Sequence, residues 1–259
     1  MSIVFTYSTD DGHPSDMKIA ELLVKNNLNG TFFVPIRNQE GRDVLSLRAM
    51  REIGGRFEIA SHTHDHYYLK RLTTVEAHYQ IIEGKKQLEE LLGKEVVGFC
   101  YPGGKYRPRH LDIVKAAGFR YARTTMNLCF DSGPNPYEMR TTFQFYPHDR
   151  IIYLRNYVKD GKWLMRHEGL RLALKSNHWI DRLYYLFEWS CRHGTVFHLW
   201  GHSWEIDELG AWQELDQFLA YVASRVARED RLDNRQLAHR CYAKLRPDTL
   251  PPLVLPPAS

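Results

Sequence analysis

The sequence has no run of about 18 apolar residues that could cross a membrane as a helix. It also lacks a long run of Lys or Arg. The 35 basic residues are nearly balanced by 31 acidic ones, for a net charge of +4. Nucleic-acid-binding proteins usually carry a cluster of basic residues, so we expect no nucleic-acid partner. The first residues lack the basic start and apolar segment of a signal peptide. A cytoplasmic enzyme is therefore expected, which leaves room for a peripheral position at the inner membrane face.

Cysteine is scarce, and its spacing is not that of a metal-binding motif. The four cysteines are Cys100, Cys129, Cys191 and Cys241, and no two form a Cys-x-x-Cys pair, which argues against a cysteine-ligated zinc knuckle. Reduced thiols are expected in a cytoplasmic chain. Hydrophobic residues make up 43% and charged residues 25% of the chain. These ordinary proportions exclude a disordered chain and a coiled coil.

Short β-like segments alternate with amphipathic helical segments through the first half of the chain. This order predicts parallel strands, in a barrel or an open α/β sheet. The clearest helix is residues 74–92, with Thr73 or Thr74 as its N-cap and Gly93 after its end. The predicted strands are residues 3–8, 31–35, 57–60, 96–101 and 119–124, with a late strand at 195–200, and further helices are predicted at 44–53, 109–117 and 212–226.

The second half of the chain is less regular. Residues 127–153 are predicted to be rich in loops, and helical stretches appear between residues 169 and 193. We expect one catalytic domain over residues 1–230, with an insertion at 128–193. Residues 231–259 are expected to form a C-terminal extension that ends in a proline-rich tail.

Polar residues follow four of the predicted strands. In parallel α/β folds, ligands bind at the carboxyl ends of the strands. Each motif alone is weak evidence, because Asp-Asp-Gly is most often a turn and 13 histidines produce spaced pairs by chance. Together the motifs are much more specific. They are Asp10-Asp11, the pair His62 and His66, the turn Pro102-Gly103-Gly104, and the pair His198 and His202.

Two imidazoles and one carboxylate form a ligand set that leaves an open coordination position on zinc. Water at such a position has a pKa of about 7 and is a usable nucleophile. A second, neighbouring carboxylate could take its proton, and a histidine across the pocket could protonate the leaving group. The combination predicts a hydrolytic metal site.

With these motifs the sequence resembles the polysaccharide deacetylases, the NodB-homology group of carbohydrate esterases. The resemblance rests on Thr9-Asp10-Asp11-Gly12, Ser61-His62-Thr63 with His66, Tyr101-Pro102-Gly103-Gly104, and the late strand that ends in histidine. It extends over roughly residues 3–230. It implies an α/β fold, a distorted (β/α) barrel of about seven parallel strands.

The resemblance also implies roles for individual residues. Asp10 would be the general base, and Asp11, His62 and His66 would hold the metal. The turn at Tyr101 and Gly103 would contribute to substrate binding, with a backbone N–H near Gly103 stabilising the oxyanion.

Two late histidines compete for the role of general acid. His202 lies in Gly201-His202-Ser203-Trp204-Glu205, which is similar to one version of the family motif. It is therefore preferred over His198, which lies on the preceding strand. Trp200 would line the acyl pocket.

The sequence departs from the family pattern at two places. The third motif usually carries an Arg two residues before its Pro, where this chain has Cys100. The fourth motif, Asp-x-x-Asp-Trp, is not found. Arg123 lies at the end of the next predicted strand, and we hypothesise that it reaches Asp10 and replaces the missing Arg.

The function implied is metal-dependent hydrolysis of an N- or O-acetyl group on a sugar, in surface-polysaccharide or O-antigen assembly. The sugar would be lipid- or nucleotide-linked, and the metal Zn²⁺, with Co²⁺, Fe²⁺ or Mn²⁺ as alternatives. Two other functions stay open. One is an amidase or deformylase, and the other is an inactive carbohydrate-binding relative, although a binding module has no need of a base such as Asp10.

Overall fold

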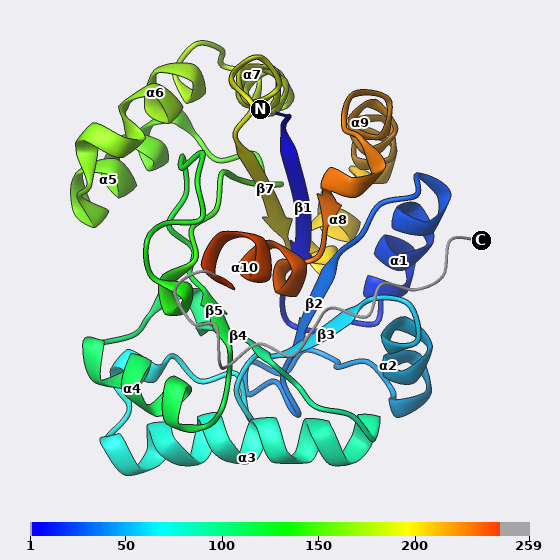
Figure 1. Cartoon of the computed structure of the whole chain (residues 1–259), viewed down its shortest axis with the longest axis vertical. Coiled ribbons are helices and arrows are strands. Elements are labelled where there is room, and N and C mark those ends of the chain that lie inside the picture. The colour runs from blue at the N-terminus through cyan, green and yellow to red at the C-terminus, as the bar shows by residue number, and fades with distance from the viewer. Residues whose placement is uncertain (1, 244–259) are drawn as a thin grey trace.

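A curled sheet of parallel strands forms the centre of the molecule in the computed structural model, which describes residues 2–243 (Figure 1). The strand order is β5-β4-β3-β2-β1-β7-β6, with β8 paired to β1, and every pairing is parallel. The expected distorted barrel of about seven strands is confirmed. The strands are β1 (Val4–Thr9), β2 (Thr31–Val34), β3 (Glu58–Ser61), β4 (Gly98–Cys100), β5 (Tyr121–Arg123), β6 (Phe143–Gln144), β7 (Val196–Gly201) and β8 (Arg231–Leu232).

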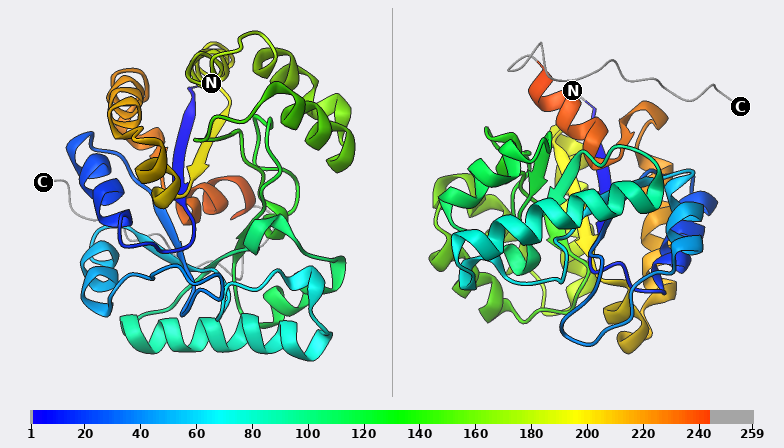
Figure 2. Two further views of the ribbon diagram at one scale, coloured as in Figure 1. Left: turned by 180° about the vertical axis from the view of Figure 1, so that it is seen from behind. Right: turned by 90° about the horizontal axis from the view of Figure 1, so that it is seen from below.

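Helices pack around the outside of this sheet, as the views from behind and below show (Figure 2). No helix in residues 2–243 is long and apolar enough to cross a membrane. The helices are α1 (Asp16–Lys25), α2 (Leu47–Gly54), α3 (Thr74–Leu92), α4 (Pro108–Ala116), α5 (Arg150–Asp160), α6 (Trp163–Ala173), α7 (Trp179–His193), α8 (Ser203–Leu209), α9 (Trp212–Arg225) and α10 (Asn234–Tyr242).

Local capping sets the helix ends. Thr73 caps α3 in a reciprocal capping box with Glu76, and Gly93 ends the helix in a left-handed conformation, as the sequence indicates. The helix predicted from residue 44 begins later, at Leu47. The reason is the Ser46 side chain, which accepts a hydrogen bond from the Ala49 N–H and so starts the helix there.

Alternation along β1 decides which side chains face the interior of the barrel. Phe5 and Tyr7 join the apolar core shared with the helices. Thr6 and Ser8 point to the other side, where Thr6 bonds to Asn234 and Ser8 to His198. Because side chains alternate along a strand, Asp10 follows on that same inner side, just beyond the end of the strand.

Helix α10 and strand β8 close the opposite end of the barrel. The α10 backbone N–H groups of Asn234 and Arg235 donate to the side chains of Thr31 and Glu58, which begin β2 and β3. Apolar residues of α10 complete a second core inside the barrel with Phe33, Ala60 and Tyr121. Residues 231–243, predicted as an extension, are thus integral to the sheet and its interior, while the proline-rich tail lies outside the described residues.

Residues 128–193, predicted as an insertion, also contribute to the sheet. Strand β6 pairs with β7 through Phe143 opposite Leu199 and Gln144 opposite Trp200. After β6 the chain forms α5, α6 and α7, of which α5 was not predicted. Strand β6 was not predicted either, because two residues are too few to show the alternation of polar and apolar side chains typical of a strand.

Candidate active site

Three side chains with metal-ligating atoms meet at the carboxyl ends of β1 and β3. Asp11 follows β1, and His62 and His66 lie in the loop after β3. The Asp11 Oδ1 atom lies 3.0 Å from His66 Nε2 and 3.6 Å from His62 Nε2. All three residues are buried, and their ligand atoms lie within 4.8 Å of one another. The predicted metal ligands are therefore brought together.

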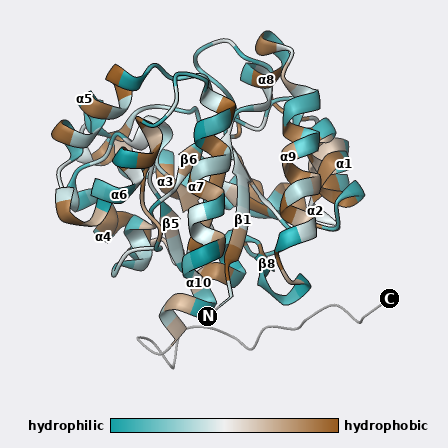
Figure 3. Ribbon diagram, turned by 90° about the horizontal axis from the view of Figure 1, so that it is seen from above, coloured by the Kyte–Doolittle hydropathy of each residue, from teal (hydrophilic) through white to brown (hydrophobic). Residues whose placement is uncertain are grey.

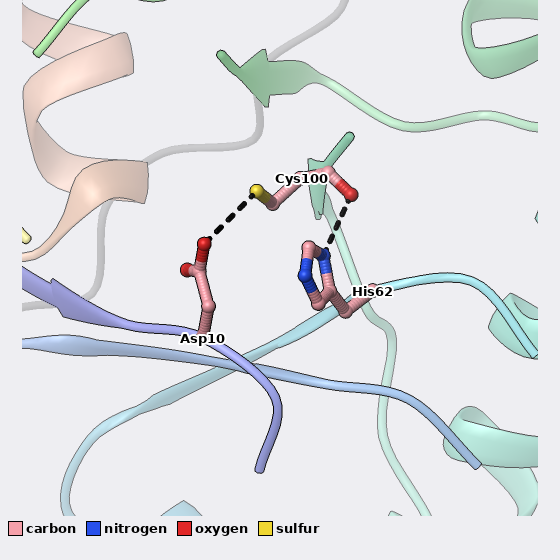
Figure 4. A group of neighbouring side chains, drawn as sticks. All are labelled: Asp10, His62 and Cys100. Carbon is pink, nitrogen blue, oxygen red and sulfur yellow. Dashed lines mark hydrogen bonds between the residues drawn. The ribbon is translucent and has the colours of Figure 1, made fainter. Parts of the chain in front are cut away.

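His62 is oriented by the backbone of the neighbouring strand. Its Nδ1 lies 2.9 Å from the Cys100 carbonyl oxygen, to which it donates (Figure 4). The Nε2 atom then carries the lone pair that faces Asp11. Burial lowers the pKa of His62 to about 4, against the attraction of Asp10 and Asp11. The imidazole is therefore neutral near pH 7, which is the form that binds metal.

The two oxygens of the Asp11 carboxylate differ, because within residues 2–243 one accepts a well-directed hydrogen bond and the other does not. Its Oδ2 accepts a hydrogen bond of 2.9 Å from Trp204 Nε1, and the Arg42 guanidinium stacks 3.5 Å from the Trp204 ring. Its buried Oδ1 receives no well-directed hydrogen bond among the described residues. Burial raises the pKa of Asp11, but His202, His66 and His62 hold it well below its usual range. A buried, ionised oxygen that faces the ring nitrogens of two histidines fits a divalent cation.

The backbone of this cluster is strained. Six non-glycine residues in the described part of the chain have positive φ, and three of them are Asp11 (76°), Thr63 (70°) and His66 (60°). Such conformations cost on the order of 1 kcal/mol each and persist only where the surroundings enforce them. Their concentration at the ligand cluster supports a functional rather than a merely structural arrangement.

Asp10 lies in a buried polar contact with Arg123 and Cys100. The Arg123 guanidinium, fully buried on β5, bonds to Asp10 Oδ1. The Cys100 thiol donates to Asp10 Oδ2 at 3.7 Å, as Figure 4 shows. The rings of Phe33 and Trp200 lie 5.0 and 4.9 Å from the guanidinium and confine it. Arg123 thus contacts Asp10 across the barrel from a different strand than the family motif uses.

A cleft of about 610 Å³ opens beside these residues. His202, Trp200 and Gly103 line it on the strand side, and residues of α5 line the opposite wall. His202 begins the turn into α8, where Glu205 Oε2 lies 2.8 Å from its Nδ1. Burial lowers the pKa of His202, but Asp11, Glu205 and Asp10 raise it to about 9. The imidazole is therefore protonated near neutral pH.

Two predicted site residues lie away from the cleft. His198 is buried inside the barrel, with its Nε2 2.9 Å from Ser8 Oγ, and burial beside Arg123 holds its pKa well below the usual range. Tyr101 is buried as well. Its hydroxyl donates to the Tyr137 carbonyl at 3.1 Å, and its N–H donates to the Arg123 carbonyl at 3.3 Å.

Sequence reasoning missed three residues that position the site. Trp204 bonds to Asp11, Glu205 bonds to His202, and the Cys100 thiol bonds to Asp10. A usable signal existed for Glu205, because a carboxylate three residues after a histidine at a helix start lies on the same face. No comparable signal links Trp204 to Asp11, which is 193 residues away in the chain.

Comparison with known proteins relates the first part of this chain to a protein family. Residues 2–122 match the family model described as polysaccharide deacetylase. The chain is a relative of the polysaccharide deacetylases. The match includes Asp10, Asp11, His62 and His66, and it ends one residue before Arg123. No curated protein matches the chain in sequence.

Solved structures extend the similarity of fold beyond residue 122. A putative polysaccharide deacetylase from Mycobacterium smegmatis is 17% identical with a TM-score of 0.66, covering 100% of this chain and 95% of that one. PuuE allantoinase is 14% identical with a TM-score of 0.65, covering 95% of this chain and 92% of that one. A mutant of a CE4-family pseudoenzyme with restored activity is 16% identical with a TM-score of 0.50, covering 86% of this chain and 63% of that one.

Not all relatives match over their whole length. The alignments cover 62% of a Streptococcus pyogenes deacetylase, and 45% each of polysaccharide deacetylases, one of them putative, from Bacillus anthracis and Bacillus cereus. At identities below 25%, it is the likeness to the Mycobacterium smegmatis protein and to PuuE allantoinase that establishes the fold of the chain, and the fold alone.

Proposed function

We propose that this deacetylase relative is a metal-dependent hydrolase that removes an N- or O-acetyl group from a sugar. The observation that carries the proposal is the convergence of Asp11, His62 and His66 on one point beside the buried Asp10. A pathway of surface-polysaccharide or O-antigen assembly in the cytoplasm, with a lipid- or nucleotide-linked sugar as substrate, is part of the same proposal.

Asp11, His62 and His66 would hold the metal. When bound, a divalent ion such as Zn²⁺ supplies Lewis acidity, which makes water a stronger nucleophile and polarises an acyl carbonyl. Two imidazoles and a carboxylate also suit Co²⁺, Fe²⁺ and Mn²⁺. Trp204 fixes the Asp11 carboxylate through Oδ2 and so leaves Oδ1 for the ion.

Asp10 is the proposed proton acceptor. Arg123 binds its Oδ1, so the carboxylate cannot rotate freely. The thiol of Cys100 is a weak donor at 3.7 Å from Oδ2. Oδ2 is therefore the oxygen that takes the proton from attacking water. Arg123 acts through Asp10 and is a positioning residue.

His202 is the proposed proton donor to the leaving group. It lines the cleft, and its proton is retained by Glu205 and the nearby aspartates. His198 has neither property, because it is buried inside the barrel away from the cleft. Gly103 supports the proposed oxyanion contact through its backbone, and Trp200 forms part of the acyl pocket. Tyr101 holds the turn at Gly103 in place, because its buried hydroxyl donates a hydrogen bond to the Tyr137 carbonyl.

The test is acetate release from a panel of acetylated sugars, free, nucleotide-linked and lipid-linked. We expect turnover that chelation abolishes and metal restores. Formylated sugars and cyclic amides belong in the same panel, since turnover of these alone would replace the acetyl assignment with an amidase or deformylase. Metal binding without turnover of any substrate would instead indicate an inactive carbohydrate-binding relative.

The pH profile should depend on Glu205. Replacing this carboxylate in Glu205→Gln removes a negative charge 2.8 Å from His202 Nδ1, so the pKa of His202 falls from about 9. Since a general acid must be protonated, we expect the alkaline limb of kcat/KM to move to lower pH by roughly one unit. A loss of activity that is equal at every pH would contradict this role for the pair.

A further inference from the structure

Exposed apolar side chains are concentrated on one helical hairpin. Among residues 2–243, twelve large apolar side chains are substantially exposed, and six of them belong to α5 and the start of α6. They are Ile151 (65% exposed), Leu154, Val158 (64%), Trp163, Leu164 (90%) and Met165. A patch of this kind on a folded protein marks an interaction surface.

Part of this set forms a stripe along one side of α5, at the edge of the molecule, whereas Met165 lies beside a separate hollow with Val4, Phe130 and Val196. Ile151, Leu154 and Val158 are three and four residues apart, so they lie along one side of α5. The turn at Gly161 then brings Trp163 beside that stripe. Two bonds hold the turn, from the Tyr157 hydroxyl to the Trp163 carbonyl at 2.8 Å and from Trp163 Nε1 to the Tyr157 carbonyl at 3.0 Å. Figure 1 shows α5 and α6 at the periphery, and Figure 3 shows hydrophobic segments on α5.

The same hairpin carries an excess of positive charge. Residues 149–175 contain seven Lys or Arg and three Asp or Glu, a net of +4, which equals the net charge of the whole sequence. Arg150, Arg155, Lys159 and Lys162 are all exposed around the apolar stripe. Arg155 and Lys159 follow Leu154 and Val158 by one residue each, so they lie between the stripe and the cleft that they also line.

We propose that the α5–α6 hairpin docks the protein on the surface of a bilayer rich in anionic lipids. Exposed Trp and Leu side chains bordered by cations are the features that bind a helix at a membrane interface. The apolar side chains enter the acyl boundary, and the cations meet the lipid phosphates. Since Arg155 and Lys159 belong to both surfaces, docking places the cleft beside the headgroups.

Charge argues against a second copy of this chain as the occupant. A two-fold dimer through this face would oppose two segments of net charge +4. Like charges across an interface oppose association, whereas an anionic bilayer complements them. The inference rests on the surface alone and does not depend on the proposed hydrolase activity.

The experiment is co-sedimentation of the full chain with vesicles of phosphatidylcholine alone and of phosphatidylcholine with an equal part of phosphatidylglycerol. We expect binding to the anionic vesicles that weakens with salt. The variant Val158→Ser/Leu164→Ser should reduce the partition coefficient about tenfold or more. Replacement of one cation in Lys162→Gln should reduce it about fivefold.

The matched control is Val75→Ser, because Val75 is 80% exposed on α3, outside the hairpin. It should bind vesicles as the wild type does, and circular dichroism checks that each variant is folded. Absence of wild-type binding to anionic vesicles would overturn the proposal, as would an equal loss in Val75→Ser. Light scattering that finds a dimer disrupted by Leu164→Ser, without vesicle binding, would assign the surface to a second copy. The assay measures no turnover, so its failure is distinct from failure of the proposed hydrolase function.

Discussion

Elemental analysis of the wild-type chain, purified without chelator, should find about one divalent metal per chain, and His62→Ala should contain almost none. The variant removes one of the three proposed ligands from a buried cluster. It also leaves Asp11 facing a single imidazole, His66. His62 is 1% exposed, so water does not readily replace it in a preformed geometry. The readout needs no knowledge of the substrate.

His64→Ala is the matched control. His64 lies between the two ligand histidines and is as buried as they are. Its Nδ1 lies 2.9 Å from Asp65 instead of facing Asp11, and its ring packs on Tyr79. We expect this variant to keep its metal. Equal metal content in His62→Ala and wild type would refute the ligand assignment, and a wild type that takes up no added Zn²⁺ would limit the family resemblance to the fold.

The second large effect is expected at Asp10. Asp10→Asn removes the proposed proton acceptor while preserving the shape of the side chain, so kcat should fall by about 10²–10⁴-fold. Metal content should stay near that of the wild type, because Asp10 is not one of the three proposed ligands at the Asp11 cluster. Parallel measurement of acetate release and bound metal separates a lost base from a lost metal. Loss of both together would make Asp10 a ligand.

Arg123→Ala tests how the base is positioned. Removing the guanidinium leaves a buried carboxylate without its partner, and breaking such a pair costs about 3–5 kcal/mol of unfolding free energy. The companion variant Arg123→Lys keeps a charge but not the planar fork of donors. We expect it to retain more stability than Arg123→Ala, yet to fall short of wild-type kcat. Unchanged activity in folded Arg123→Ala would remove Arg123 from the mechanism.

The replacement of the usual motif arginine by Cys100 makes physical sense in this arrangement. On β4 the Cys100 side chain contacts Asp10 Oδ2 while its backbone carbonyl accepts from His62. Arg123 reaches Asp10 Oδ1 from the adjacent β5, with which β4 is paired at Cys100 and Arg123. A second arginine at position 100 would place like charges side by side in a buried site. The presence of Cys100 on β4 and of Arg123 on β5 is thus consistent with one linked change.

The sequence was informative wherever local rules determine structure. Helix α3, with its Thr73 cap and Gly93 end, and the strands that precede Asp10 and His62 follow from periodicity and capping. The family motifs predicted which residues meet at the Asp11 cluster, and the structure brings Asp11, His62 and His66 together. The helix and its caps depend on neighbours within a few residues.

Other features depend on contacts between distant segments. Strand β6 has two residues and no readable pattern, yet β7 pairs with it. The bond from Trp204 to Asp11 spans 193 residues, and no propensity encodes it. Likewise β8 and α10 looked like a C-terminal extension, because only the folded barrel shows that Asn234 and Arg235 meet the starts of β2 and β3.

The position of the ligands in the chain has a consequence for biosynthesis. The proposed metal ligands lie between Asp11 and His66, whereas His202 and Trp204 come from the last quarter of the sequence. A nascent polypeptide emerging from the ribosome therefore exposes its metal-binding side chains long before the groups that orient and use them. Strand β7 directly precedes His202 and helix α10 follows Trp204, so both elements, which close the barrel around β1, are also made late. Newly made chains must complete this late assembly before a loaded ion could serve in catalysis.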